Sequence, residues 1–149
     1  MSMFGAIDAS ASGMTAERLR MDVISNNIAN ANTTRTAEGG AYHRRFVVFE
    51  PRETKQKSFF SMLSGEMASS SPAGDGVRAV GIQADNTPGN MVFDPANPDA
   101  NANGYVEMPN VNIVTEMVDM ITASRAYEAN ATAVNTAKSM AAKALDIGK

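Results

Sequence analysis

Apolar residues recur at alternating three- and four-residue steps through the last third of the chain. This stripe consists of Ile113, Met117, Met120, Tyr127, Ala131, Val134, Ala141 and Leu145. A repeat of that period keeps one face of an α-helix turned toward a partner along its whole length. The pattern therefore predicts a continuous helix of about 36 residues, roughly 54 Å long, within residues 112–149.

A second amphipathic pattern lies at the N-terminal end, over about residues 3–31. Its apolar positions are Ile7, Ala11, Met14, Met21 and Ile28, flanked by Leu19, Val23 and Ile24. Such a stripe predicts a helix that buries one face. Because the two long helices enclose the rest of the sequence, we expect them to pair as an antiparallel, coiled-coil-like hairpin.

The segment between the helices predicts short strands. Residues 42–50 (YHRRFVVFE) have the composition of a β-strand ended by Pro51, and residues 77–83 and 91–93 are further strand candidates. The predicted fold class is therefore α+β, with long N- and C-terminal helices and a small β-rich middle domain.

Three units follow along the chain. They are the N-terminal helix of an axial core (1–35), the β-rich middle insert (36–110) with a mobile loop at about 64–75, and the C-terminal helix of the core (111–149). Residues 94–110 are rich in Pro, Asn and Gly, and we expect them to form a long connection without regular structure.

Asparagines mark both of the inner helix ends. Four of them lie within residues 26–32, and their side chains compete with helical hydrogen bonds, so the first helix should stop near Ala31. Asn112 is well placed as the N-cap of the last helix. Glu116 then lies in the first turn, where a carboxylate complements the helix dipole.

Composition excludes several classes of protein. The chain has 149 residues, 44% hydrophobic and 19% charged, with a net charge of −3 and no cysteine. Nucleic-acid binding would require a basic face, and disulfides and finger-type zinc sites require cysteine. No stretch is long and apolar enough to span a bilayer, and the N-terminus lacks the features of a cleaved signal, so by the usual routes the chain would stay in the cytoplasm.

One loop resembles half of a calcium site. Asp99, Asn101, Asn103 and Gly104 reproduce the first part of a D-x-N-x-N-G loop, but the twelfth position is Asn110 instead of the bidentate glutamate that such loops use. Polar turn chemistry explains the same residues. We therefore predict no metal and no cofactor.

No catalytic arrangement is evident in the sequence. The only histidine, His43, falls in a predicted strand, where we expect a surface or edge residue. Glu116 and Asp119 could pair as acid and base, but no pattern marks a pocket around them. Arg44 and Arg45 lie on opposite faces of the same strand, which favours a solvated strand with some capacity for an interface. We predict that the protein is not an enzyme.

Two runs of residues resemble the bacterial flagellar rod and hook axial proteins. Residues 24–33 (ISNNIANANT) are similar to the N-terminal signature of that family, and the run from Gly104 (GYVEMPNVN) is similar to its C-terminal end. The second run also resembles the proximal rod type, which has a short central insert. The residues that carry the resemblance include Asn26, Asn27, Asn30, Asn32, Thr33, Tyr42, Asn110, Asn112, Arg125, Tyr127 and Asn130.

The resemblance implies a structural subunit of the flagellar rod, the drive shaft that crosses the periplasm and transmits torque from the basal-body ring to the hook. It implies self-association and assembly with other rod subunits and with the protein at the junction of membrane ring and rod. It also implies export by the flagellar type III apparatus without a cleaved signal peptide. Neither nucleic-acid binding nor membrane insertion is implied.

The pattern of residues independently favours assembly. Val114, Val118 and Ile121 form a second apolar row on the last helix, and an extra row requires an extra neighbour. The predicted assembly interface consists of Ile7, Met14, Met21, Ile24, Ile28, Ile113, Met117, Met120, Ile121, Tyr127, Val134 and Leu145. The residues leave two alternatives open: a soluble helical binding module such as an export chaperone or adaptor, and a metal-dependent enzyme that uses the acidic residues of 94–103.

Overall fold

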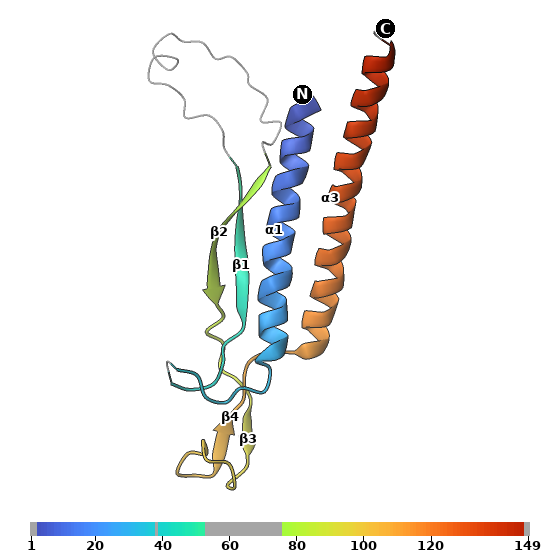
Figure 1. The fold of residues 1–149 in the computed structure, drawn as a ribbon. Coiled ribbons are helices and arrows are strands. Elements are labelled where there is room, and N and C mark those ends of the chain that lie inside the picture. The colour runs from blue at the N-terminus through green and yellow to red at the C-terminus, as the bar shows by residue number, and fades with distance from the viewer. Residues whose placement is uncertain (1–2, 38, 53–75, 148–149) are drawn as a thin grey trace, which may run out of the picture.

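Two long antiparallel helices form the axis of the molecule in the computed structural model, which describes residues 3–37, 39–52 and 76–147 (Figure 1). In chain order the elements are α1 (Met3–Ala29), β1 (Arg45–Pro51), β2 (Val77–Ala84), β3 (Met91–Phe93), β4 (Tyr105–Glu107) and α3 (Ile113–Ile147). The chain termini lie at one end, the β1–β2 ribbon runs along α1, and the β3–β4 ribbon lies at the opposite end. The predicted α+β class is confirmed.

Small residues bring the two helices close together. Ala16 on α1 and Ala123 and Ala137 on α3 are buried. A Cβ atom built on Gly13 would lie 2.9 Å from Nδ2 of Asn130, so the missing side chain at Gly13 leaves room for Asn130 of α3. Short side chains at a helix crossing allow the neighbouring ridges to interdigitate. Neither helix contains, within the described residues, a stretch apolar enough to cross a membrane.

The first turns of α3 present a different face to α1 than the apolar stripe predicts. Ile113 and Met117 are exposed, whereas Glu116 and Ala123 are 0% exposed. At the far end of the helix, Leu145 is also exposed instead of facing a partner. The expectation that these three residues pack against the first helix was wrong, while their place in an assembly interface stays a prediction. At the first turns, a carboxylate with buried partners occupies the inward position, and the apolar residues beside it turn outward.

The β1–β2 ribbon is antiparallel, with Arg45 opposite Ala84 and Pro51 opposite Val77, and with a bulge between Val48 and Phe49. The strand begins three residues later than predicted, because the backbone N–H groups of Tyr42 and Arg44 have partners outside the ribbon. The amide of Tyr42, for example, donates a hydrogen bond to the carbonyl of Thr33 (3.0 Å). Pro51 ends the ladder as its last paired residue, where a missing N–H is tolerated.

The second ribbon was only half predicted. Met91–Phe93 forms β3 as expected, but residues 105–107, which we expected to lack regular structure, form β4 and pair with it. Gly104 precedes β4 with φ of +78°, a conformation that glycine adopts without strain. The rings of Phe93 and Tyr105 then meet edge to face at 5.2 Å between centroids.

Asparagine side chains terminate both helices as predicted. Oδ1 of Asn112 accepts the backbone N–H groups of Val114 (3.0 Å) and Thr115 (3.2 Å), which confirms the N-cap of α3. At the end of α1, Nδ2 of Asn30 donates to the carbonyl of Asn26 (2.9 Å). The expected mobile loop at 64–75 lies outside the described residues.

Candidate functional site

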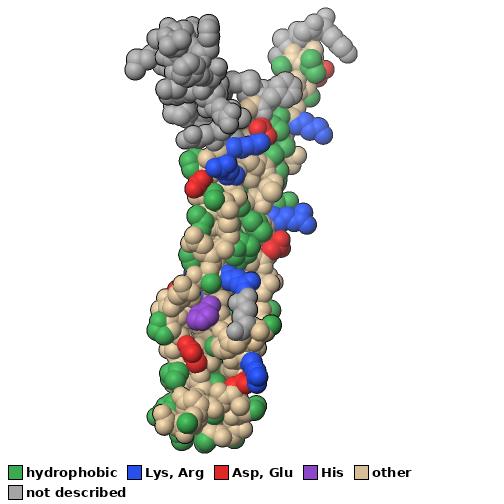
Figure 2. Space-filling model, turned by 90° about the vertical axis from the view of Figure 1, so that its left-hand side faces the viewer, with side chains coloured by type: hydrophobic (Ala, Val, Ile, Leu, Met, Phe, Trp, Pro, Cys, Tyr) green, Lys and Arg blue, Asp and Glu red, His purple; other side chains and the backbone are tan. Residues whose placement is uncertain are grey.

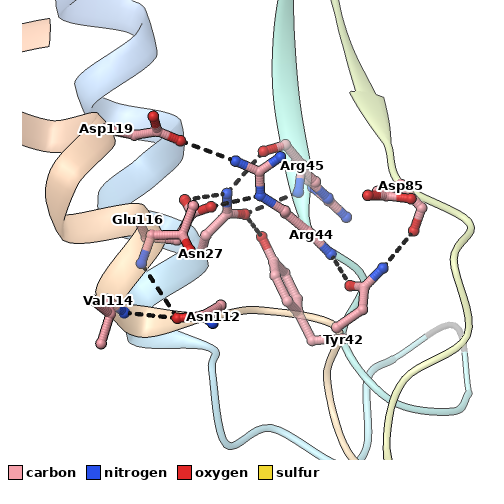
Figure 3. A network of polar contacts seen from close by, with 11 residues as sticks. Asn27, Tyr42, Arg44, Arg45, Asp85, Asn112, Val114, Glu116 and Asp119 are labelled. Atoms are coloured by element: carbon pink, nitrogen blue, oxygen red, sulfur yellow. Dashed lines mark hydrogen bonds and ion pairs between the residues drawn. The ribbon is translucent and has the colours of Figure 1, made fainter. Parts of the chain in front are cut away.

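A cluster of polar side chains joins the helices to the strands where α1 ends and α3 begins (Figure 3). We call this cluster the polar junction; it consists of Asn27, Tyr42, Arg44, Arg45, Asp85, Asn110, Glu116 and Asp119. It draws on α1, on β1 and the residues before it, on the end of β2, on the segment before α3 and on α3 itself. The cluster fixes the relative positions of elements that are far apart in the sequence.

Asn27 is at the centre of the junction and is 0% exposed. Its Oδ1 accepts the hydroxyl of Tyr42 (3.0 Å) and the backbone N–H of Arg45 (2.9 Å). Its Nδ2 donates to the carbonyl of Arg45 (2.8 Å) and to Oε2 of Glu116 (2.9 Å). The amide group therefore uses both donors and two acceptor positions, and it pairs with Arg45 as a neighbouring strand would.

Arg44 neutralises the buried carboxylate of Glu116. Its Nε lies 2.5 Å from Oε1 of Glu116, and its Nη2 lies 3.2 Å from Oδ2 of Asp119, one turn further along α3. Glu116 is 0% exposed, and a buried charge is tolerated when it is paired and hydrogen-bonded. The guanidinium provides the paired charge, and Asn27 provides a hydrogen bond to the second oxygen.

Asn110 holds the entry to β1 against the exit from β2. Its Oδ1 accepts the backbone N–H of Arg44 (2.6 Å), and its Nδ2 donates to the carbonyls of Asp85 (3.0 Å) and Thr87 (2.9 Å). Two hydrogen bonds from Thr87 lower the pKa of the Asp85 carboxyl: the one from its side-chain hydroxyl has the larger effect, and the one from its backbone N–H adds to it. Arg44 and Arg45 are thus held by two asparagine amides, one on each side of the chain.

Tyr42 completes the junction on its inner side. Its side chain is buried, and burial raises the pKa of its hydroxyl, with the Glu116 carboxylate acting in the same direction and the Arg45 guanidinium opposing it. The guanidinium carbon of Arg45 lies 5.8 Å from the centroid of the Tyr42 ring, within the range of a cation–π contact. The two arginines therefore have different partners, Arg44 the carboxylates of α3 and Arg45 the ring of Tyr42.

The sequence did not predict this network. Arg44 was interpreted as part of a solvated strand, but it precedes β1 and binds Glu116. Glu116 was assigned to the helix dipole and, together with Asp119, to a possible acid and base pair. Arg44 holds both carboxylates. His43 is exposed, as expected, in the segment before the strand.

The calcium-like loop makes turn contacts. Oδ2 of Asp99 accepts the hydroxyl of Thr34 (2.8 Å), and Arg35 lies 3.6 Å from its other oxygen. Oδ1 of Asn101 accepts the backbone N–H groups of Asn103 (2.9 Å) and Tyr105 (3.0 Å). Across the part of the chain that the structure describes, no three acidic or histidine side chains gather as metal ligands would.

A row of apolar side chains is exposed on α3, directly beside the polar junction. We call this the apolar row; it consists of Ile113, Val114, Met117, Val118 and Ile121. Val114 is 71% exposed, and Val118 and Ile121 are exposed by more than half. The three- and four-residue spacing places these side chains on one face of the helix, away from α1. Large contiguous apolar patches on soluble domains are typical of contact surfaces.

Most of the other predicted interface residues are at least partly covered within the single molecule. Seven are half-buried: Ile7, Met14, Met21, Ile28, Met120, Tyr127 and Val134. Ile24 is only 5% exposed, so its side chain belongs to the core of the single molecule. Leu145 is exposed. The apolar row and Leu145 are therefore the parts of the predicted interface that one chain leaves uncovered.

The residues that carry the family resemblance have mostly structural roles. Besides the junction residues, Thr33 donates its hydroxyl to Oδ1 of Asn30 (3.2 Å), and Asn130 faces Gly13 across the helix pair. Asn32 and Arg125 are exposed.

Comparison with known proteins gives two family matches at the two ends of the chain. Residues 7–35 match the family model described as flagella basal body rod protein, and residues 102–147 match the C-terminal model of flagellar basal body rod FlgEFG proteins. The chain is similar to proteins named flagellar basal-body rod protein FlgC from three bacteria. The protein from Bacillus subtilis is 46% identical to this chain, and the match covers 100% of both chains. The protein from Borreliella burgdorferi is 47% identical, with 99% of this chain and 98% of the relative covered. The protein from Escherichia coli O6:H1 is 35% identical, with 100% of both chains covered.

Proposed function

This chain belongs to the flagellar basal-body rod protein family and is a structural subunit of the flagellar rod, and from this premise we propose how it carries load. We propose that it transmits torque through packed contacts between its apolar row and adjacent rod subunits. The observation that carries this proposal is the exposure of that row. Val114 and Val118 remain largely exposed although α3 already packs against α1 along its length. Covering the row in an assembly would remove apolar surface from water, which favours association.

Torque transmission by packing requires no chemistry. Many distributed van der Waals contacts resist shear together, although each contributes only about 0.1–0.2 kcal/mol. Interlocking side chains at native packing density also transmit strain because they cannot be compressed easily. The polar junction supports this role by holding the first turns of α3, and hence the apolar row, in a fixed position relative to α1 and the strands.

The partners we propose are other rod subunits, further copies of this chain and the protein at the junction of membrane ring and rod. We also propose that the chain crosses the inner membrane through the flagellar type III export apparatus and reaches the periplasmic rod with α1 intact. The assembled subunit needs α1, because α1 packs against α3, on which Ala123 and Ala137 are buried.

The substitution Val118→Asp tests the proposed interface. Val118 is 57% exposed, so the change should alter the free energy of unfolding of the purified chain by no more than about 0.5 kcal/mol. It should nevertheless prevent rod assembly, because a carboxylate would be buried without a partner in each contact. Swimming in soft agar and the yield of basal bodies provide the measurement.

Ala133→Asp is a matched control. Ala133 is also an exposed residue of α3, but it is fifteen residues after Val118 and is therefore not its neighbour on the helix surface. It should affect motility far less than Val118→Asp. Normal swimming of the Val118→Asp strain would contradict the proposal. A discrete dimer of the purified chain that Val118→Asp dissociates without loss of swimming would favour the alternative of a soluble binding module.

A further inference from the structure

Several methionine side chains are open to solvent in the single molecule. Met91, Met117 and Met140 are 56%, 52% and 57% exposed. Met91 belongs to β3, at the end of the molecule where Figure 2 shows further hydrophobic side chains on the surface. Met117 and Met140 both belong to α3, the first near its start and the second near its C-terminal end. Of these three methionines, Met117 alone is part of the apolar row.

Met117 lies at the centre of the apolar row. Ile113 is four residues before it, Val114 is three residues before it and Ile121 is four residues after it, and residues at these spacings are neighbours on a helix surface. The other members of the row are valine and isoleucine, whose saturated hydrocarbon side chains a peroxide does not oxidise. Met117 is therefore the oxidisable side chain of the row, and it has apolar neighbours in both directions along the helix.

The thioether of an exposed methionine reacts with hydrogen peroxide. A lone pair of the sulfur attacks one peroxide oxygen, an S–O bond forms, the O–O bond breaks, and the other oxygen leaves as water. The sulfur is oxidised and the peroxide is reduced. The product, methionine sulfoxide, is polar and chiral, and it disrupts contacts that the apolar side chain made. A polar S–O group that is buried without a hydrogen-bond donor is unfavourable.

We propose that Met117 is an oxidation site that controls entry of the free chain into the rod, with hydrogen peroxide as the oxidant. The chain assembles with the thioether form of Met117 and fails to assemble with the sulfoxide form. This inference rests on the proposed function, because it specifies how the apolar row is regulated. Met117 reacts before assembly, while it is exposed, and neighbouring subunits then shield it in the rod. Methionine sulfoxide reductases reverse the change.

Peptide mapping by mass spectrometry tests the chemical part on the full-length chain. Treated with hydrogen peroxide, Met117 should gain one oxygen atom at least about threefold faster than the half-buried Met14 and Met21, since exposure favours oxidation. Met91 and Met140 provide the rate of exposed methionines outside the row. In isolated basal bodies, Met117 should react at least about tenfold more slowly than in the free chain. A slow reaction in the free chain, or equal rates in the two states, would overturn the proposal.

The substitution Met117→Gln tests the consequence for assembly, because glutamine has a similar length and a polar end. The yield of basal bodies should fall at least about tenfold, since each contact would bury an uncompensated polar group. Met140→Gln is the matched control on the same helix, and it should leave the yield unchanged. Urea unfolding of the purified variants should give the midpoint of the natural chain, because both side chains are largely exposed. A normal yield with Met117→Gln would contradict the inference.

Peroxide treatment during synthesis of the chain provides a second test that does not depend on a mimic. Each strain is compared with its own untreated yield of basal bodies. The fractional loss should be smaller with Met117→Leu than with the natural chain, because leucine is not oxidised, and Met140→Leu should lose as much as the natural chain. Equal losses in all three strains would overturn the role of Met117.

Comparison with Val118→Asp separates this inference from the proposed function. Normal assembly with Met117→Gln and loss of assembly with Val118→Asp would refute oxidation control and leave the role of the apolar row intact. Normal assembly with both variants would refute both proposals.

Discussion

At the scale of single residues, Asn27 replaces a missing strand. Its amide group pairs with both the N–H and the C=O of Arg45, so the start of β1 has ladder-like hydrogen bonds on the side facing α1. The same amide also donates to the buried Glu116 carboxylate. Asn110 accepts the backbone N–H of Arg44 and donates to the carbonyl of Asp85, and so links the start of β1 to the residue after β2. Two side chains thus set the direction in which the β1–β2 ribbon leaves the helix pair.

Replacing Asn27 by alanine should destabilise the molecule. The change leaves the hydroxyl of Tyr42, the N–H of Arg45 and one oxygen of Glu116 without their buried partner, and each such loss costs about 1–3 kcal/mol, less whatever water can restore. We expect a loss of at least ~2 kcal/mol in urea unfolding of the purified chain. Asn86→Ala, in an exposed turn, should change the free energy by less than about 0.5 kcal/mol. An equal effect of both variants would show that the junction contributes little.

Tyr42 should make stability fall at alkaline pH. Its pKa is raised in the folded state above the ordinary value of 10.0, so the neutral hydroxyl is preferred in the fold. This preference contributes fully to the free energy of unfolding at pH values below the pKa that Tyr42 has in the unfolded chain. The contribution is lost as the pH rises through the pKa of Tyr42 in the folded chain. Unfolding measured between about pH 9 and 11.5 should therefore show a steeper decline for the natural chain than for Tyr42→Phe. Parallel declines would mean that Tyr42 titrates normally.

The residues of the junction could be found in the sequence only in part. The family resemblance singled out Asn27, Tyr42 and Asn110 but gave them no contacts. Glu116 resembled an ordinary helix-start carboxylate, yet it lies four residues before Met120 and seven before Ala123, on the inward face. The spacing of Glu116 from these residues is the signal in the sequence that could have predicted a buried carboxylate on the last helix. Periodicity alone could not identify its partner, because Arg44 is remote in the sequence.

At the scale of elements, long patterns predicted more than short ones. Both helices appear where the three- and four-residue repeats placed them, because many positions contribute to each pattern. The three residues of β4 were missed, since Tyr105–Glu107 lies in a segment dominated by Asn, Pro and Gly and gains its regularity from pairing with β3. The start of β1 was placed too early for the opposite reason. Residues 42–44 have strand composition, but the backbone N–H groups of Tyr42 and Arg44 bind Thr33 and Asn110 instead of a neighbouring strand.

The close approach of α1 and α3 at Gly13 predicts a coupled pair of substitutions. Gly13→Val should destabilise the chain by about 1–3 kcal/mol, because the added side chain meets Asn130 and forces the helices or the amide to move. Adding Asn130→Ala should recover part of that loss by making room. Thermal unfolding of the four members of this cycle gives the coupling energy. Additive effects would show that the two residues do not contact each other.

At the scale of the whole molecule, one chain does not cover its own apolar surface. Each helix buries one face against the other, and the polar junction fixes their ends. The apolar row of α3 and side chains of the β3–β4 ribbon nevertheless remain exposed. The sequence pattern predicted an uncovered row at Val114, Val118 and Ile121, but it placed Ile113 and Met117 on the face that packs against the first helix, whereas both are exposed. That distinction depends on the rotation of α3 about its axis, which Glu116 sets through Arg44 and Asn27.

The accessibility of Val118 in the free chain and in the rod tests the central claim most directly. A motile strain carrying Val118→Cys is used, and a thiol reagent is applied to the purified protein and to isolated basal bodies, followed by separation of the chain from other components. We expect rapid modification of the free chain, in which Val118 is 57% exposed, and modification in the rod slowed by at least about tenfold, because burial excludes the reagent. Equal rates in the two states would contradict the claim that neighbouring subunits cover this row.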